Sequence, residues 1–371
     1  MELTNGAIPS SKGMMTDLES LRTQDPADMY SAILNFPRYA REGVELGRNS
    51  PLLSKSKAKR IVILGMGGSA IGGDLLRSYI QSFPGTGGVD IHVSRSYTPP
   101  YVDAKTTVIA SSYSGNTEET LAAYQSVRDV AGQTLVITTG GTLGGWADAA
   151  GTRKIVPPGG LQPRAALPYS FFPLLYSLAV KSELFGAEVR EATERGIDEA
   201  IALLDKLTKK YSSGPKKGNT AFALAEKING SIPVIYSASD RLDTVNLRWR
   251  GQIQENAKYL AFGNLLPEMN HNEISGWGHP RELVGKFVAI FLRDRDDHER
   301  VARRIDITRR TIARAAGASH EIRSEGESLL ARMFSLICLG DWTSYYLAVL
   351  NGADPSPVPL IENLKKQLAK D

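Results

Sequence analysis

Cysteine is nearly absent from this sequence of 371 residues, in which Cys338 is the single example. One thiol forms neither an internal disulfide nor a zinc site built from several cysteines. The residues around it, FSLICLG, are apolar and indicate a side chain packed in a core. A chain that does without disulfides suits a reducing compartment, so we expect a cytoplasmic protein.

The sequence also lacks the marks of a secreted or membrane protein. Residues 1–20 are polar and acidic, whereas a signal peptide has a basic start followed by an apolar stretch. The longest apolar stretch, residues 167–180, is interrupted by two prolines and two serines, and it is shorter than the roughly 20 residues that cross a bilayer. We therefore expect no membrane partner.

No strong charge of one sign is present, since Lys and Arg total 44, Asp and Glu total 40, and the net charge is +4. So small an excess predicts no nucleic-acid partner. The most charged run, residues 293–310, mixes both signs at helical spacing and indicates a solvent-exposed helix with i,i+4 ion pairs. With 42% hydrophobic residues the composition is that of a globular protein. The length corresponds to about two domains plus tails.

Apolar, strand-like runs alternate with helix-like segments along most of the chain, and a Gly-, Pro- and Lys-rich linker separates two sets of them. This alternation predicts an α/β fold with doubly wound, flavodoxin-like parallel sheets. We divide the chain into a helical leader (1–52), a first domain (53–210), a second domain (211–352) and a C-terminal tail helix (353–371). The predicted strands are residues 60–65, 89–95, 106–110, 134–139 and 152–158, then 231–239, 286–294 and 320–326, and later helices are predicted near 243–261, 296–316 and 326–350.

A glycine-rich loop directly follows the first predicted strand. Its residues 65–70 (GMGGSA) match G-x-G-x-x-A, a variant of the dinucleotide-binding fingerprint. That fingerprint expects an acidic residue at the end of the second strand, where this sequence has Arg95. Because an arginine could serve a 2′-phosphate, a nucleotide-dependent oxidoreductase is one interpretation of the loop.

A second loop, residues 111–120 (SSYSGNTEET), joins the third predicted strand to a helix. Hydroxyls, free backbone N–H groups and the positive end of the helix dipole together form an anion site that can hold a phosphate monoester. In the alternative interpretation, Ser114 or Thr117 only caps the helix. The presence of Ser112 and of Ser69 on the neighbouring loop favours the phosphate site.

These two loops resemble the sugar isomerase (SIS) domain superfamily. The second is similar to its signature, and GMGGSAIGG resembles the first loop of its bifunctional phosphoglucose/phosphomannose isomerases. The likeness continues in order through GLQPRAALPY, QIQENAKYLAF, PEMNHNEISGW and DPSPVPLIENLKKQL, over roughly residues 55–371. It implies two SIS-type domains in one chain and a phosphate site formed by Gly68, Ser69, Ser112, Ser114 and Thr117.

The same resemblance implies an isomerase of hexose 6-phosphates. The expected reaction interconverts glucose 6-phosphate and fructose 6-phosphate, together with mannose 6-phosphate and fructose 6-phosphate, through a metal-independent cis-enediol. We expect no cofactor and no metal, and we expect a homodimer.

Such a reaction needs a base that moves a proton between C2 and C1, an acid that opens the ring and a cation that stabilises the enediolate. The resemblance implies that Glu255 is the base. This residue lies on a predicted helix whose apolar face includes Trp249, Ile253 and Leu260, and a half-buried carboxylate there would suit a base. From the residues alone, the favoured interpretation is a surface glutamate paired with Lys258 or Tyr259.

The other implied catalytic residues come from separate segments. The resemblance makes His271 the ring-opening residue, contributed across the dimer interface, although a surface or capping histidine fits the local sequence too. Glu273 either orients it or caps a helix. Arg164 would supply the cation, or it is a loop arginine bonded to backbone carbonyls. Lys365 matches the family's C-terminal lysine, and for it and Lys366 a solvated helix face is the alternative.

One departure from the resemblance concerns the two C2 epimers. Relatives with dual activity carry a threonine near the C-terminal lysine, where this sequence offers Ser356 and Val358. The sequence therefore leaves the preference between glucose 6-phosphate and mannose 6-phosphate open. A non-catalytic regulatory protein that binds sugar phosphates is the main alternative function.

Overall fold

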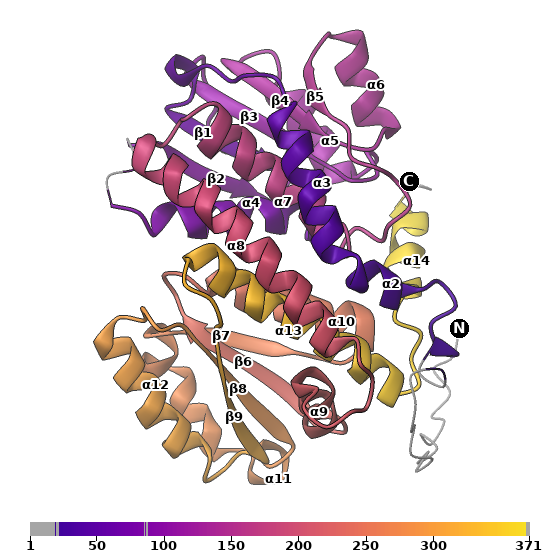
Figure 1. Ribbon diagram of the computed structural model, residues 1–371, viewed down its shortest axis with the longest axis vertical. Helices are drawn as coiled ribbons and strands as arrows, with labels where there is room; N and C mark the ends of the chain where they lie inside the picture. The colour runs from indigo at the N-terminus through magenta and orange to yellow at the C-terminus, as the bar shows by residue number, and fades with distance from the viewer. Residues whose placement is uncertain (1–18, 20–21, 85, 87, 369–371) are drawn as a thin grey trace.

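The computed structural model describes Glu19, residues 22–84, Thr86 and residues 88–368. Two parallel sheets lie one above the other in Figure 1, with long helices between them. The strand orders are β2-β1-β3-β4-β5 and β7-β6-β8-β9. The predicted α/β fold with two doubly wound sheets is therefore confirmed. The limits of the leader, the two domains and the tail stay predictions, and most of residues 1–21 lie outside the described residues.

The first sheet forms because its central strands are short apolar runs that are buried on both faces. Val62 and Leu64 of the first strand are fully buried, and the third strand has no exposed residue. The helix after the first strand packs on one face of the sheet, and the helices after the third and fourth strands pack on the other. The elements are β1 (Arg60–Leu64), α4 (Gly67–Gln81), β2 (Asp90–Ser94), β3 (Thr106–Ser111), α5 (Glu118–Val127), β4 (Gln133–Ile137), α6 (Gly141–Ala149) and β5 (Arg153–Ile155).

The second sheet repeats this arrangement with four strands. All of its pairings are parallel, and β6 lies between β7 and β8 as β1 lies between β2 and β3. Its elements are α9 (Thr220–Ile228), β6 (Ile232–Ala238), α10 (Asp243–Ala257), β7 (Phe262–Leu266), the 3-10 turns Glu268–His271 and Glu273–Gly278, α11 (Arg281–Val284), β8 (Phe287–Arg293), α12 (Glu299–Ile312) and β9 (Ala318–Arg323).

Two sequence predictions in the second half were wrong. The helix predicted to run to residue 261 ends at Ala257, because Lys258 adopts a left-handed conformation with φ 57° that a helix cannot continue. Leu260, assigned to the buried face, is 66% exposed as a result. The edge strand β7 was missed, since Gly263 and Asn264 interrupt its apolar pattern.

The helices between the sheets complete the core. Helices α2 (Met29–Leu34) and α3 (Phe36–Arg48) lie in the segment predicted as a helical leader, and α3 packs on α7 (Leu167–Leu175). A π-helical turn (Tyr176–Lys181) leads from α7 to α8 (Ala187–Tyr211), and α8 packs on α13 (Leu329–Leu350). Helix α13 is long and apolar enough to cross a membrane, but 94% of its apolar window is buried inside the protein. It is therefore the central core helix.

A C-terminal arm ends the described chain. It comprises residues 353–368, which include helix α14 (Pro359–Leu368), drawn in yellow beside α2 in Figure 1. No residue of α14 is buried, and Leu360 is 83% exposed. A helix of ten residues has little stability by itself, so the arm depends on the contacts of the segment that precedes the helix.

Candidate active site

The strand order of the first sheet places a site at one edge. The chain leaves β1 for β2 on one side and returns to β3 on the other, so the loops after β1 and β3 diverge at the carboxyl ends of these strands. Ligands of doubly wound sheets bind at this position. Helices α4 and α5 begin in these loops, and both direct their positive N-termini to the same edge.

The predicted hydroxyl residues of the two loops contact one another. The backbone N–H of Tyr113 donates to Ser69 Oγ at 3.0 Å, which joins the loops. Ser112 Oγ lies 2.9 Å from Thr117 Oγ1 and accepts from the N–H of Gly115 at 3.1 Å. Thr117 is the N-cap residue of α5 but makes no side-chain capping hydrogen bond, so the capping interpretation does not account for its hydroxyl.

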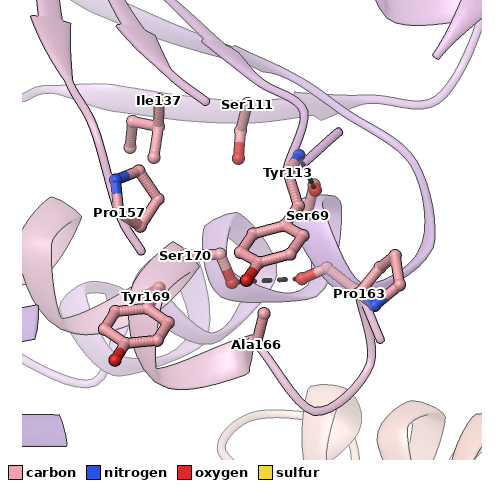
Figure 2. A pocket seen from close by; sticks show the side chains of 10 residues that line it. Ser69, Ser111, Tyr113, Ile137, Pro157, Pro163, Ala166, Tyr169 and Ser170 are labelled. Carbon is pink, nitrogen blue, oxygen red and sulfur yellow. Dashed lines mark hydrogen bonds between the residues drawn. The ribbon is translucent and has the colours of Figure 1, made fainter. Parts of the chain in front are cut away.

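The loop hydroxyls differ in accessibility. Ser112 is fully buried and Ser69 is 8% exposed, whereas Ser114 is exposed. Ser112 thus shapes the loop, while Ser114 and Thr117 lie on its open side. Figure 2 shows the small pocket of about 10 Å³ where Ser69, Tyr113 and the start of α7 meet. That volume is close to the minimum that a single water needs, and a phosphate does not fit inside it.

Two glycines make these loop conformations feasible. Gly115 has φ 71°, and a Cβ there would lie 1.9 Å from the carbonyl oxygen of Gly140. At Gly68 a Cβ would lie 2.3 Å from the carbonyl oxygen of Pro163. The absence of a side chain at Gly68 lets the segment that carries Arg164 approach the N-terminus of α4.

Glu255 and Arg164 face each other in a pocket between the two sheets. Arg164 Nη1 lies 3.5 Å from Glu255 Oε2, and the side chains are 3% and 32% exposed. The pocket has a volume of about 140 Å³ and shares Gly68 with the pocket at the hydroxyl loops. It is lined by Gly67, Gly68, Ile71, Arg95, Arg164, Leu247, Arg248, Gly251, Gln252 and Glu255. A carboxylate and a cation therefore lie next to the proposed phosphate site.

Most of the Arg164 guanidinium is already bonded. Its Nε donates to Asn256 Oδ1 at 2.6 Å, and Nη2 donates to the carbonyls of Pro355 and Ser356 at 2.6 and 2.7 Å. Burial lowers the pKa of Arg164, and the Glu255 carboxylate opposes that change. Arg164 therefore binds backbone carbonyls, as one of the two sequence interpretations expects, and also directs Nη1 at Glu255. Its role as the catalytic cation stays a prediction.

His271 does not line this pocket. It ends a 3-10 turn after β7 and is exposed, and its side chain has no hydrogen bond or ion pair to another residue of the described chain. The Glu273 carboxylate accepts hydrogen bonds from the hydroxyl of Tyr236 and, at 2.7 Å, from Asn264 Nδ2. Glu273 therefore stabilises the loop rather than bonding to His271.

Lys365 is also separate from the pocket within this chain. It and Lys366 lie on α14, whose residues are all exposed. Ser356, the residue noted near the family's threonine, is 3% exposed, and its carbonyl accepts the bond from Arg164. The arm thus reaches the pocket through its backbone.

Two further arginines line the pocket. Arg95 pairs with Asp74 of α4, with Nη1 3.3 Å from Oδ1, so the residue considered for a 2′-phosphate belongs to the same pocket as Glu255. Sequence reasoning missed Arg248, which is 4% exposed and donates through Nη2 to the carbonyl of Arg164 and to Asp341 Oδ2. The sequence signal that could have identified Arg248 is its position seven residues before Glu255 on the same helix, which places both side chains on one face. Burial raises the pKa of Asp341, and Arg248 opposes this.

No metal site is evident in the described part of the chain, where no group of three or more His, Cys, Asp or Glu side chains is placed to hold an ion. The chemistry that the pocket can perform with its own side chains is proton transfer by a carboxylate beside a fixed cation.

Comparison with known proteins agrees with the observed fold. A family model described as the SIS domain matches residues 55–149. A second, described as the bacterial phospho-glucose isomerase C-terminal SIS domain, matches residues 217–368. The first match covers β1 to β4 of the five-stranded sheet, and the second covers all of the four-stranded sheet.

Among similar sequences, a bifunctional phosphoglucose/phosphomannose isomerase of Caldicellulosiruptor bescii is 43% identical over 92% of this chain and 99% of its own. A protein of the same name from Aquifex aeolicus is 38% identical over 84% of this chain and 91% of its own. Among solved structures, a hypothetical protein from Thermus thermophilus aligns with a TM-score of 0.70 at 18% identity, covering 95% of this chain and 93% of that one. That last likeness concerns the fold alone.

Proposed function

We propose a mechanism for a chain that belongs to the family of bifunctional phosphoglucose/phosphomannose isomerases. As an aldose–ketose isomerase, it interconverts glucose 6-phosphate and fructose 6-phosphate, and mannose 6-phosphate and fructose 6-phosphate. The observation that carries the mechanism is the contact of Glu255 with Arg164 in a pocket that also contains the N-terminus of α4.

The substrate phosphate binds over the two loops at the carboxyl ends of β1 and β3. Ser114 and Thr117 donate from the open side, Ser69 and the backbone at Gly68 complete the site, and the buried Ser112 holds the loop in shape. The N-termini of α4 and α5 add favourable dipoles. The site therefore binds a dianion without a lysine, which agrees with the small net charge of the chain.

Glu255 performs the proton transfer. Its carboxylate removes the proton from C2 of the open-chain aldose, the electron pair of the C2–H bond forms the C1–C2 double bond, and the C1=O pair moves onto O1, which is protonated to give a cis-enediol. Loss of the O2 proton then forms the C2 carbonyl as Glu255 returns its proton to C1. Arg164 Nη1 stabilises the negative charge on the enediolate oxygens. Because C2 is planar in this intermediate, protonation there from opposite sides gives the two epimers. These steps use side chains of the protein and require no cofactor.

His271 opens the sugar ring from the partner subunit of a homodimer. Its exposure and its absence from the lining of the Glu255 pocket support this placement, as do the exposed apolar residues Leu360 and Leu364 on α14. Lys365, on the same helix, contacts substrate hydroxyls. A cytoplasmic location fits the buried free thiol of Cys338.

Mixing two inactive variants tests the shared site. In a heterodimer of Glu255→Gln and His271→Ala subunits, one of the two sites has both native residues if His271 acts across the interface. Random reassembly should therefore recover about a quarter of the wild-type activity. No recovery, with heterodimers verified by mass spectrometry, would place His271 in the site of its own chain.

The activity itself is tested by incubating the protein with fructose 6-phosphate. We expect both glucose 6-phosphate and mannose 6-phosphate to form. A protein that binds fructose 6-phosphate in calorimetry and forms neither aldose would instead be a regulatory sugar-phosphate-binding protein.

A further inference from the structure

The C-terminal arm is attached to the catalytic pocket by consecutive backbone carbonyls. Lys258 Nζ donates to the carbonyl of Asp354 at 2.6 Å, and Arg164 Nη2 donates to those of Pro355 and Ser356. Asn351 Nδ2 adds a bond of 3.3 Å to the carbonyl of Ala257, the last residue of α10. The segment before α14 is thus fixed by two cations at the C-terminal end of the helix that carries Glu255.

Lys258 joins this segment to the helix itself. Besides Asp354, its ammonium binds the carbonyls of Glu255 at 2.8 Å and Asn256 at 3.2 Å. These carbonyls belong to the last turn of α10, where a positive charge also opposes the negative end of the helix dipole. An ammonium has three N–H donors, and here three carbonyls accept them.

The arm also supplies hydrogen-bond acceptors to the guanidinium of Arg164. Two of the four acceptors of its guanidinium are arm carbonyls, and the other two are Asn256 Oδ1 and Glu255 Oε2. Release of the arm would leave the buried guanidinium held only by Asn256 at Nε and by the long 3.5 Å contact of Nη1 with Glu255, so it could turn within the pocket. The position of Nη1 in the pocket therefore depends on the arm.

We propose that Lys258 is a positioning residue of the isomerase: its ammonium holds the C-terminal arm against the last turn of α10 and thereby fixes Arg164 beside Glu255. The attachment of the arm stands on the contacts alone, whereas the kinetic consequence rests on the proposed roles of Glu255 and Arg164. Arg164, Glu255 and Asp354 are the charged groups that face the ammonium.

The attachment also depends on pH. Burial, followed by the charge of Arg164, lowers the pKa of Lys258 to about 8, while Asp354 and Glu255 oppose this. A neutral amine has two N–H donors and directs its lone pair at a carbonyl oxygen, so one of the three bonds becomes repulsive. The arm should therefore loosen as the pH rises through that value.

Hydrogen–deuterium exchange of the full-length protein tests the attachment directly. In Lys258→Met, peptides that cover residues 352–368 should exchange about tenfold faster than in the wild type. Lys258→Arg, which keeps the charge and its donors, should exchange like the wild type. The control is Lys227→Met, which removes an exposed lysine from the last turn of α9. Wild-type exchange in Lys258→Met would overturn the proposal.

Kinetics tests the consequence for the reaction. We expect Lys258→Met to lower kcat about tenfold with little change in KM, because Arg164 acts on the enediolate. Lys258→Arg should restore kcat and move the alkaline decline of kcat above its wild-type position near pH 8. Equal losses in both variants, or an unmoved alkaline decline, would contradict the positioning role. If the wild type itself lacked activity, the exchange experiment would still decide whether Lys258 holds the arm.

Discussion

The two sheets share one topology and present opposite chemistry at equivalent loops. After β3 of the first sheet, residues 112–117 supply hydroxyls and backbone N–H groups without an acidic side chain. After β8, the equivalent strand of the second sheet, residues 294–298 contain three aspartates. A loop position that suits a phosphate in one half is therefore occupied by negative charge in the other.

The aspartates of the second loop serve the core. Asp294, whose side chain is fully buried, accepts from Arg332 Nε at 2.8 Å and from Ser324 Oγ at 3.0 Å. Asp296 pairs with the same arginine at 2.6 Å. Arg332 lies on the central helix α13, so this loop anchors a helix, whereas the first loop is proposed to bind the substrate phosphate.

The helices that follow the first strand of each sheet also differ in the charge at their N-termini: the first turn of α4 has no acidic residue, and that of α10 has one. Helix α4 directs its N-terminus at the pocket, whereas the first turn of α10 has Asp243, which accepts hydrogen bonds from Arg77 Nη2 and Ser78 Oγ of α4, each at 2.6 Å. Helix α10 contributes to the pocket through Glu255, near its other end. In the proposed mechanism, the first half binds the substrate phosphate and the second half supplies the base, so one repeated topology serves two purposes.

Removal of the base should have the largest effect. Glu255→Gln keeps the size and the hydrogen bonds of the side chain but cannot accept the C2 proton, so kcat should fall about 10³-fold. Steady-state turnover of fructose 6-phosphate measures this, with Glu226→Gln on α9 as the matched control. Retention of activity within tenfold would exclude Glu255 as the base.

Breaking the buried ion pair of the second loop should affect stability alone. Asp294→Asn leaves the buried Arg332 without its closest buried partner, and the free energy of unfolding should fall by about 3 kcal/mol. Asp296→Asn, at a half-exposed site, should cost less than about 1 kcal/mol. Denaturant unfolding measures both, and KM for fructose 6-phosphate should stay unchanged. A higher KM in Asp294→Asn would mean that this loop also binds substrate.

Giving the first loop the charge of the second should abolish its preference for phosphate. Ser114→Asp places a carboxylate on the open side of the loop, where it repels the phosphate dianion, and we expect KM to rise about 100-fold. Ser114→Ala, which removes one donor without adding charge, should raise KM about tenfold. Equal KM values for the two variants would contradict a phosphate site at this loop.

The smallest expected effect is a pH dependence confined to the second loop. Burial raises the pKa of Asp297 to about 6, Asp294 contributes to this increase, and Arg293 opposes it. The folded protein therefore binds this proton more tightly than the unfolded chain, and the stabilisation is lost as the pH rises through about 6. From pH 7 to pH 4 the wild type should gain about 2 kcal/mol relative to Asp297→Asn, measured by denaturant unfolding at both pH values. A constant difference would show that Asp297 titrates normally.

The sequence was most informative where local pattern determines structure. The strand around Val62 and Ile63, the glycine loop after it and the hydroxyl loop before Glu118 are contiguous signals, and the structure contains each of them. The end of α10 was not predictable in this way, because NAKYL has ordinary helix propensity and the left-handed Lys258 is stabilised by Asp354, far away in the chain.

The site was less predictable than the fold because its contacts join residues that are far apart in the sequence. Glu255 and Arg164 were identified by resemblance, but their contact joins residues 91 positions apart. The bonds from Arg164 to residues 355 and 356 span more than half the chain, and no local pattern encodes them. Arg248 escaped notice because its burial depends on Asp341, a charged residue within an apolar helix. The roles of His271 and Lys365 stay predictions.

Proton exchange at C2 in D2O tests the central claim most directly. The wild-type protein is incubated with glucose 6-phosphate, mannose 6-phosphate or fructose 6-phosphate, and products and deuterium content are read together by NMR. The proposed mechanism predicts that each substrate yields the other two, with deuterium entering C2 of the aldoses and C1 of the ketose. Binding of the sugar phosphates without exchange at either carbon would contradict the account.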